Sequence, residues 1–186
     1  MNKRNIILEN KGFKLYGLIY MPKNPKCIIQ IIHGAKEHKE RYDDFCRYLY
    51  EHDIASIIFD LRGHGMSLSK EYFLGHMGKL DLMLEDQYII YQYIQNQFSN
   101  LDYFLFGHSL GSVFARCLII KHPVYAKGLI LSGMANYIDS VKVGLKLAKG
   151  INIISNRIGH NPLLMRLGDN GNDDWVCQNE KSMTIY

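Results

Sequence analysis

Residues 103–122 read Tyr-Phe-Leu-Phe-Gly-His-Ser-Leu-Gly-Ser-Val-Phe-Ala-Arg-Cys-Leu-Ile-Ile-Lys-His, and the rest of the chain is organised around them. It begins with the apolar run 103–106, whose length suits a buried β-strand. After a turn at 107–111 it continues with apolar residues at helical spacing, namely Val113, Phe114, Cys117 and Leu118. The stretch therefore predicts a buried strand that turns directly into a helix.

The turn reads Gly107-His108-Ser109-Leu110-Gly111, a G-x-S-x-G pattern. Between a strand and a helix this pattern is typical of a nucleophile elbow, in which the serine stands on a sharp corner. Gly107 and Gly111 lack Cβ atoms, so strand and helix can approach closely. Ser109 would lie at a helix N-terminus, where free N–H groups favour a developing oxyanion. We interpret Ser109 as a candidate nucleophile, the alternative being a serine in an ordinary loop.

Length and composition indicate a soluble globular chain. The 186 residues suffice for one domain with a sizeable core, and 47% hydrophobic with 22% charged residues is ordinary for that class. No apolar run reaches membrane-spanning length, and no signal peptide is expected at the N-terminus. The net charge of +4 is mild and its Lys and Arg residues are scattered, so a nucleic-acid partner is not expected. No metal or cofactor is predicted.

The cysteines favour a reducing compartment. They are widely separated and form no C-x-x-C pair: Cys27, Cys46, Cys117 and Cys177. Reduced thiols in a cytoplasmic protein are the simplest interpretation.

The rest of residues 1–134 alternates between short apolar segments and amphipathic ones. The expected elements are a hairpin over 5–22 that turns at 10–12, strands over 27–32, 54–59 and 128–132, and helices over 40–52 and 80–98. Phe45 and Leu80 are expected on the buried faces of these helices. Such alternation predicts the α/β class, a mostly parallel sheet with helices on both faces.

Residues 135–186 change character and do not form another strand–helix unit. We interpret them as a partial cap or lid inserted after a core of residues 1–134. Lysines on one helical stripe of this segment are Lys142, Lys146 and Lys149. They could meet anionic lipid headgroups in a peripheral membrane contact, or they could form an ordinary solvated face.

Two further stretches agree in order and spacing with the 107–111 turn. One is His33-Gly34-Ala35 followed by Glu37-His38 and Arg41-Tyr42, and the other is Asp60-Leu61-Arg62-Gly63-His64-Gly65-Met66-Ser67. Together the three stretches resemble the α/β-hydrolase superfamily, and within it the monoacylglycerol lipase and lysophospholipase branch, with its H-G-x-G-E-H-x-x-R-Y, D-x-R-G-H-G-x-S and G-H-S-M-G motifs. Lys36 departs from this pattern, since the family often has Gly at that position.

The resemblance implies an α/β-hydrolase fold and a serine hydrolase that acts on carboxylic esters of small or single-chain lipids. Ser109 would be the acyl nucleophile, and the backbone N–H groups of Ala35 and Leu110 would form the oxyanion hole. His64 is expected to be structural. Peptidase and thioesterase activities stay open, because the fold alone does not choose among them.

Three polar residues after the first motif have two open interpretations: Glu37, His38 and Arg41. The resemblance implies that they shape the polar end of the substrate site. They could equally form a structural charge network under the cap.

The resemblance also implies that two catalytic partners are missing. In the family the chain order is Ser, then Asp, then His, and this sequence reaches Tyr186 apparently within the cap. Substitutes conceivable within the cap are His160, Asp169, Asp173 and Asp174. Without an acid and a base, the chain would be a catalytically incompetent fragment that at most binds acyl ligands. We further expect that strand 128–132 is a sticky edge, and that the chain is either cut from a longer one or associates through that edge.

Overall fold

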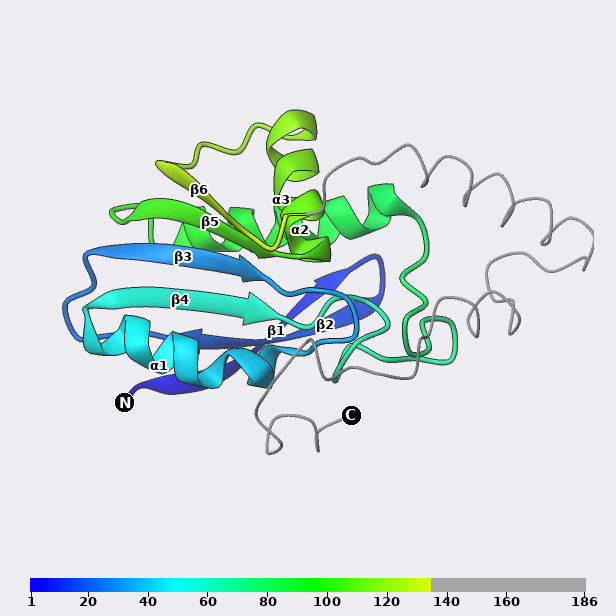
Figure 1. The fold of residues 1–186 in the computed structure, drawn as a ribbon, viewed down its shortest axis with the longest axis horizontal. Coiled ribbons are helices and arrows are strands. Elements are labelled where there is room, and N and C mark those ends of the chain that lie inside the picture. The colour runs from blue at the N-terminus through cyan, green and yellow to red at the C-terminus, as the bar shows by residue number, and fades with distance from the viewer. Residues whose placement is uncertain (135–186) are drawn as a thin grey trace, which may run out of the picture. The chain divides into compact units, whose positions relative to one another are not determined.

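The computed structural model describes residues 1–134, which contain a six-stranded sheet of order β1-β2-β4-β3-β5-β6 (Figure 1). The strands are β1 Lys3–Asn10, β2 Phe13–Tyr20, β3 Cys27–Ile32, β4 Ile54–Phe59, β5 Asp102–His108 and β6 Gly128–Ser132. β1, β2 and β4 pair antiparallel, whereas β4, β3, β5 and β6 pair parallel. The predicted mostly parallel α/β sheet is confirmed.

The hairpin of β1 and β2 closes through a two-residue turn. Lys11 and Gly12 both have positive φ angles, 52° and 80°, and Asn10 pairs with Phe13 across the turn. Two consecutive positive φ angles match the right-handed twist of the strands that they join. The hairpin predicted from the sequence therefore has a local cause.

Helices cover both faces of the sheet, as Figure 1 shows. They are α1 Asp43–Glu51, which follows the 3₁₀ turn η1 Lys39–Tyr42, then α2 Leu80–Gln97 and α3 Leu110–Lys121. Successive residues of β3 point to opposite faces: Ile28 packs with α2 and α3, and Ile29 packs with α1. β3 is therefore apolar along nearly its whole length, as a strand covered on both sides must be.

Two expected inward residues are on the surface instead. Phe45 is 37% exposed at the margin of the face by which α1 buries Cys46 and Leu49, and its ring centre lies 5.3 Å from that of Phe106. Leu80 is 52% exposed, because it is the first residue of α2 and the buried face of that helix begins at Met83.

β6 is an edge strand of the sheet within the described range, and Leu129 and Ile130 are 39% and 44% exposed there. The apolar edge expected from the sequence is thus present among these residues. The predicted cap lies outside the described residues. The same is true of its lysine stripe and of His160, Asp169, Asp173, Asp174 and Cys177. None of the helices between residues 1 and 134 has the length and apolar character needed to cross a bilayer.

Candidate active site

Ser109 stands at the corner where β5 gives way to α3. Its φ and ψ angles are 50° and −116°, a conformation that costs a non-glycine residue about 1–3 kcal/mol. Three hydrogen bonds hold this backbone: its N–H donates to the Ser132 carbonyl at 2.9 Å, and its carbonyl accepts from the Ser112 N–H at 2.9 Å and the Ser112 hydroxyl at 2.6 Å. Ser109 itself is only partly buried. The corner is therefore rigid, and its serine is accessible.

The glycines of the elbow are required by close backbone contacts. A Cβ on Gly107 would lie 2.4 Å from the Gly111 carbonyl oxygen, and a Cβ on Gly111 would lie 2.0 Å from the Ile32 carbonyl oxygen. The first turn of α3 therefore lies directly against the end of β3, and no side chain fits between them.

The loop after β3 flanks the serine. A Cβ on Gly34 would lie 3.2 Å from the Ser109 Cβ, and the next residue, Ala35, is exposed. Leu110 is the first residue of α3, so no carbonyl of that helix accepts its N–H. The structure thus places Leu110 directly after Ser109 and places Gly34, the residue before Ala35, against the Ser109 side chain.

Lys36 in this loop has a φ of 55°, in the left-handed region that glycine adopts without cost. A lysine pays about 1–2 kcal/mol for that conformation. The backbone of this turn therefore explains why the resembling family often has Gly at the position, and Lys36 keeps the same backbone at a cost.

The Glu37 carboxylate lies against the Gly34 loop. It is 6% exposed, and its Oε2 accepts from the Gly34 N–H at 2.7 Å and from the Tyr42 hydroxyl at 2.8 Å. Its Oε1 lies 3.3 Å from Arg41 Nε. His38 lies one residue further on and its Nδ1 is 2.9 Å from a carboxylate oxygen of Glu40. Glu37, one of the three predicted polar residues, is therefore bonded to the candidate oxyanion loop.

His33 is fully buried and neutral. Its Nε2 accepts the Leu61 N–H at 2.9 Å, so its Nδ1 carries the proton and donates to the Gly34 carbonyl at 2.7 Å. Burial lowers the pKa of His33 to about 3. The His64 ring packs edge-on against His33 at 5.2 Å, and His64 Nδ1 donates to the Arg62 carbonyl, in keeping with the structural role expected for His64.

Buried ion pairs anchor the loop after β4. Asp60 accepts from both the backbone N–H and the Nζ of Lys39 at 2.7 Å, and Arg62 binds Asp86 of α2 at 2.5 and 2.9 Å. The Arg62 guanidinium also lies 4.0 Å from the ring centre of Phe13. These charges are paired, and they fix the loop beside the site rather than forming a site of their own.

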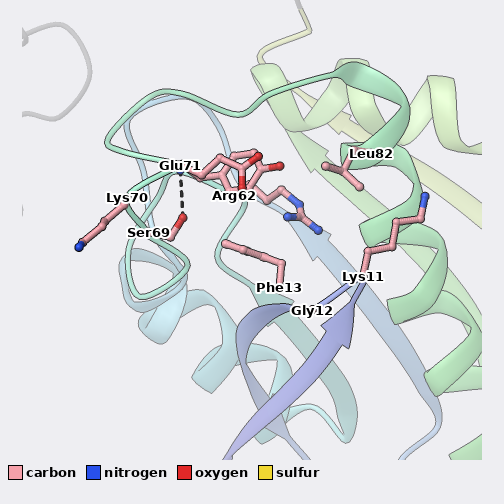
Figure 2. Close-up of a pocket in the computed structure, with 9 residues that line it drawn as sticks. Lys11, Gly12, Phe13, Arg62, Ser69, Lys70, Glu71 and Leu82 are labelled. Atoms are coloured by element: carbon pink, nitrogen blue, oxygen red, sulfur yellow. Dashed lines mark hydrogen bonds between the residues drawn. The ribbon is translucent and has the colours of Figure 1, made fainter.

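Figure 2 shows a pocket on another part of the loop after β4. Its volume is about 490 Å³. Its lining residues are Lys11, Gly12, Phe13, Arg62, Ser69, Lys70, Glu71, Tyr72 and Leu82. Ser109 and the Gly34 loop do not line it, and Arg62 at its wall is neutralised by Asp86. We therefore assign the candidate site to the Ser109 corner and not to this pocket.

A family model described as serine aminopeptidase, S33, matches residues 23–186 of the chain. The chain belongs to this α/β-hydrolase family. It is 27% identical over 144 residues to the monoglyceride lipase of Homo sapiens, covering 75% of this chain and 46% of that protein. It is also 30% identical to protein phosphatase methylesterase 1 of Candida albicans, over 64% of this chain and 31% of the relative. The chain thus spans less than half the length of these curated relatives.

Solved structures agree with this membership. A thermostable carboxyl esterase from Bacillus coagulans superposes with a TM-score of 0.73 at 28% identity, over 84% of this chain and 52% of the esterase. A soluble variant of monoglyceride lipase from Saccharomyces cerevisiae has a TM-score of 0.64 at 18% identity, over 78% and 49%, which supports the shared fold.

An α/β-hydrolase serine needs a base. The nearest histidine in sequence, His108, has its Nδ1 3.2 Å from the Ser132 hydroxyl and its Nε2 3.9 Å from Glu37 Oε1. Within residues 1–134 no three His, Cys, Asp or Glu side chains cluster as a metal site would require. The described part of the chain therefore contains the candidate nucleophile Ser109 and the loop and helix start that flank it.

Proposed function

We propose that this chain carries the nucleophile of a serine carboxylic-ester hydrolase of the monoacylglycerol lipase and lysophospholipase type. The observation that carries the proposal is the strained, accessible Ser109, held at the start of a helix beside the Gly34 loop. The likeness to a monoglyceride lipase and to a carboxyl esterase supports esters of small or single-chain lipids as the substrate class.

In the proposed reaction the Ser109 hydroxyl oxygen attacks the ester carbonyl carbon while a general base accepts its proton. The carbonyl oxygen becomes an oxyanion, to which the N–H groups of Leu110 and Ala35 donate. One such donor contributes about 10²–10³-fold to the rate in serine hydrolases. The alcohol leaves with a proton from the protonated base, and water then releases the acyl group from Ser109.

The acid and the base are proposed to follow residue 134, since the family order is nucleophile, acid, base. In one version of the proposal His160 is the base and one of Asp169, Asp173 and Asp174 is the acid. In the other version a further segment supplies both groups. The alternative function is an incompetent hydrolase fragment that binds acyl ligands. Peptidase activity stays a second enzymatic candidate, because the matching family is described as serine aminopeptidase.

Labelling with a fluorophosphonate probe tests the proposal. We expect covalent labelling of the wild-type chain that disappears in Ser109→Ala. Ser69→Ala is the matched control, since Ser69 is an exposed loop serine and its removal should leave labelling intact. An unlabelled wild-type chain would support the incompetent fragment. A labelled chain that cleaves aminoacyl amides faster than short-chain monoglycerides would favour the peptidase.

Two finer assignments remain proposals. His38 and Arg41 are proposed to face the polar end of the substrate, and the stripe of Lys142, Lys146 and Lys149 is proposed to touch anionic lipid. Sedimentation with vesicles of anionic and of neutral phospholipid tests the second assignment, which requires binding to the anionic vesicles alone. A cytoplasmic location is part of the same proposal.

A further inference from the structure

We infer that Glu37 is a positioning residue that, together with His33, orients the Ala35 N–H toward the oxyanion. This inference rests on the proposed function, because it assigns Glu37 a part in the chemistry of Ser109. The His33 side chain holds the peptide group between Gly34 and Ala35, and the Glu37 side chain holds the peptide group between His33 and Gly34.

The geometry follows from peptide planarity. The Gly34 carbonyl and the Ala35 N–H belong to one planar trans peptide, so they point in opposite directions. The Gly34 carbonyl accepts the His33 Nδ1–H at 2.7 Å, which turns the Ala35 N–H away from the His33 ring. The preceding peptide is fixed by the 2.7 Å bond from the Gly34 N–H to Glu37 Oε2. The direction of the Ala35 N–H is therefore set by two buried side chains.

Glu37 is itself held in one place. Its Oε2 also accepts the Tyr42 hydroxyl at 2.8 Å, and its Oε1 faces Arg41 Nε at 3.3 Å. Burial, and next the Glu37 charge, raise the pKa of the Tyr42 phenol, so this hydroxyl stays protonated and donates. Because both carboxylate oxygens have partners and the group is 6% exposed, it can support the loop without swinging.

The loop needs such support because its backbone is unfavourable. Lys36, the residue after Ala35, has a φ of 55°, and without a restraint the turn would relax toward conformations that lysine prefers. A relaxation that turns the Ala35 N–H leaves Ser109 and its helix unchanged but removes one oxyanion donor. The expected consequence is a slower chemical step with unaltered substrate affinity.

The test measures fluorophosphonate labelling of Ser109 in the full chain, resolved into the maximal inactivation rate and the probe affinity. Glu37→Ala should lower the maximal rate by about 100-fold and leave the affinity unchanged. Glu37→Gln keeps an oxygen for the Gly34 N–H, so its loss should be about 10-fold or less, and Tyr42→Phe should lose about 3-fold.

Asp86→Asn is the matched control. Asp86 is as buried as Glu37 and is also paired with an arginine, but it holds α2 to the loop after β4. This variant should melt at a lower temperature and still label at the wild-type rate per folded molecule. If Glu37→Ala is unfolded at the assay temperature, Glu37→Gln and Tyr42→Phe decide.

The outcomes separate two failures. A wild-type chain that does not label overturns the proposed function and this inference with it. A wild-type chain that labels, with Glu37 and Tyr42 variants at the same maximal rate, overturns the inference alone. The same holds if all three variants lose only probe affinity, since that result indicates substrate contact rather than positioning.

Discussion

Acid should lower the free energy of unfolding of this protein through one buried ring, that of His33. Its Nε2 accepts the Leu61 N–H, so a second proton would place two donors face to face in a site without water access. The pKa of His33 falls from 6.5 to about 3, mainly through burial. The unfolded chain therefore binds a proton that the folded chain does not between those values, and stability falls as pH drops below 6.5. At 1.36 kcal/mol per unit, the loss is about 2 kcal/mol by about pH 5, and about 5 kcal/mol at most near pH 3.

The assay compares urea unfolding of the wild type and of His33→Asn at neutral pH and near pH 5. The asparagine amide can still donate to the Gly34 carbonyl but does not titrate, so the variant should be less stable at neutral pH and lose about 2 kcal/mol less on acidification. His64, whose pKa burial also lowers, is present in both proteins, and because it packs against the His33 ring its own titration must be followed in each. Equal losses in the two proteins would refute the reasoning, as would an NMR titration of His33 with a midpoint near 6.5.

Two further predictions concern the elbow and the sheet edge. Gly111→Ala should cost about 3 kcal/mol and slow fluorophosphonate labelling by about 100-fold, because its Cβ would lie 2.0 Å from the Ile32 carbonyl oxygen and must force α3 from β3. Gly12→Ala is the control, since an alanine at the φ of 80° costs about 1 kcal/mol of stability but no atom crowds the new Cβ. Equal labelling rates in the two variants would contradict the account. At the edge strand β6, concentration-dependent self-association is expected in sedimentation velocity, and Ile130→Lys should reduce it. A wild-type chain that is monomeric at every concentration would show that the edge does not associate.

The sequence determined the features that depend on neighbours along the chain. The G-x-S-x-G turn predicted a serine on a strand-to-helix corner, and Lys11-Gly12 predicted a tight hairpin, because both depend on the backbone freedom of a few adjacent residues. The apolar run of β3 likewise predicted a strand covered on both faces. Phe45 shows where this reasoning failed, since α1 buries Cys46 and Leu49 while Phe45 stays 37% exposed at the margin of that face.

The partners that hold the corner in place became visible in the folded structure. The Ser132 carbonyl holds the Ser109 N–H from 23 residues away, Leu61 sets the His33 tautomer from 28 residues away, and Arg62 meets Asp86 24 residues further on. No local pattern marks such partners, because a hydrogen bond depends on where the folded sheet brings two groups and not on their spacing in the chain. The chain order therefore predicts the nucleophile, whereas the pairing of β3, β4, β5 and β6 supplies the groups that keep it oriented.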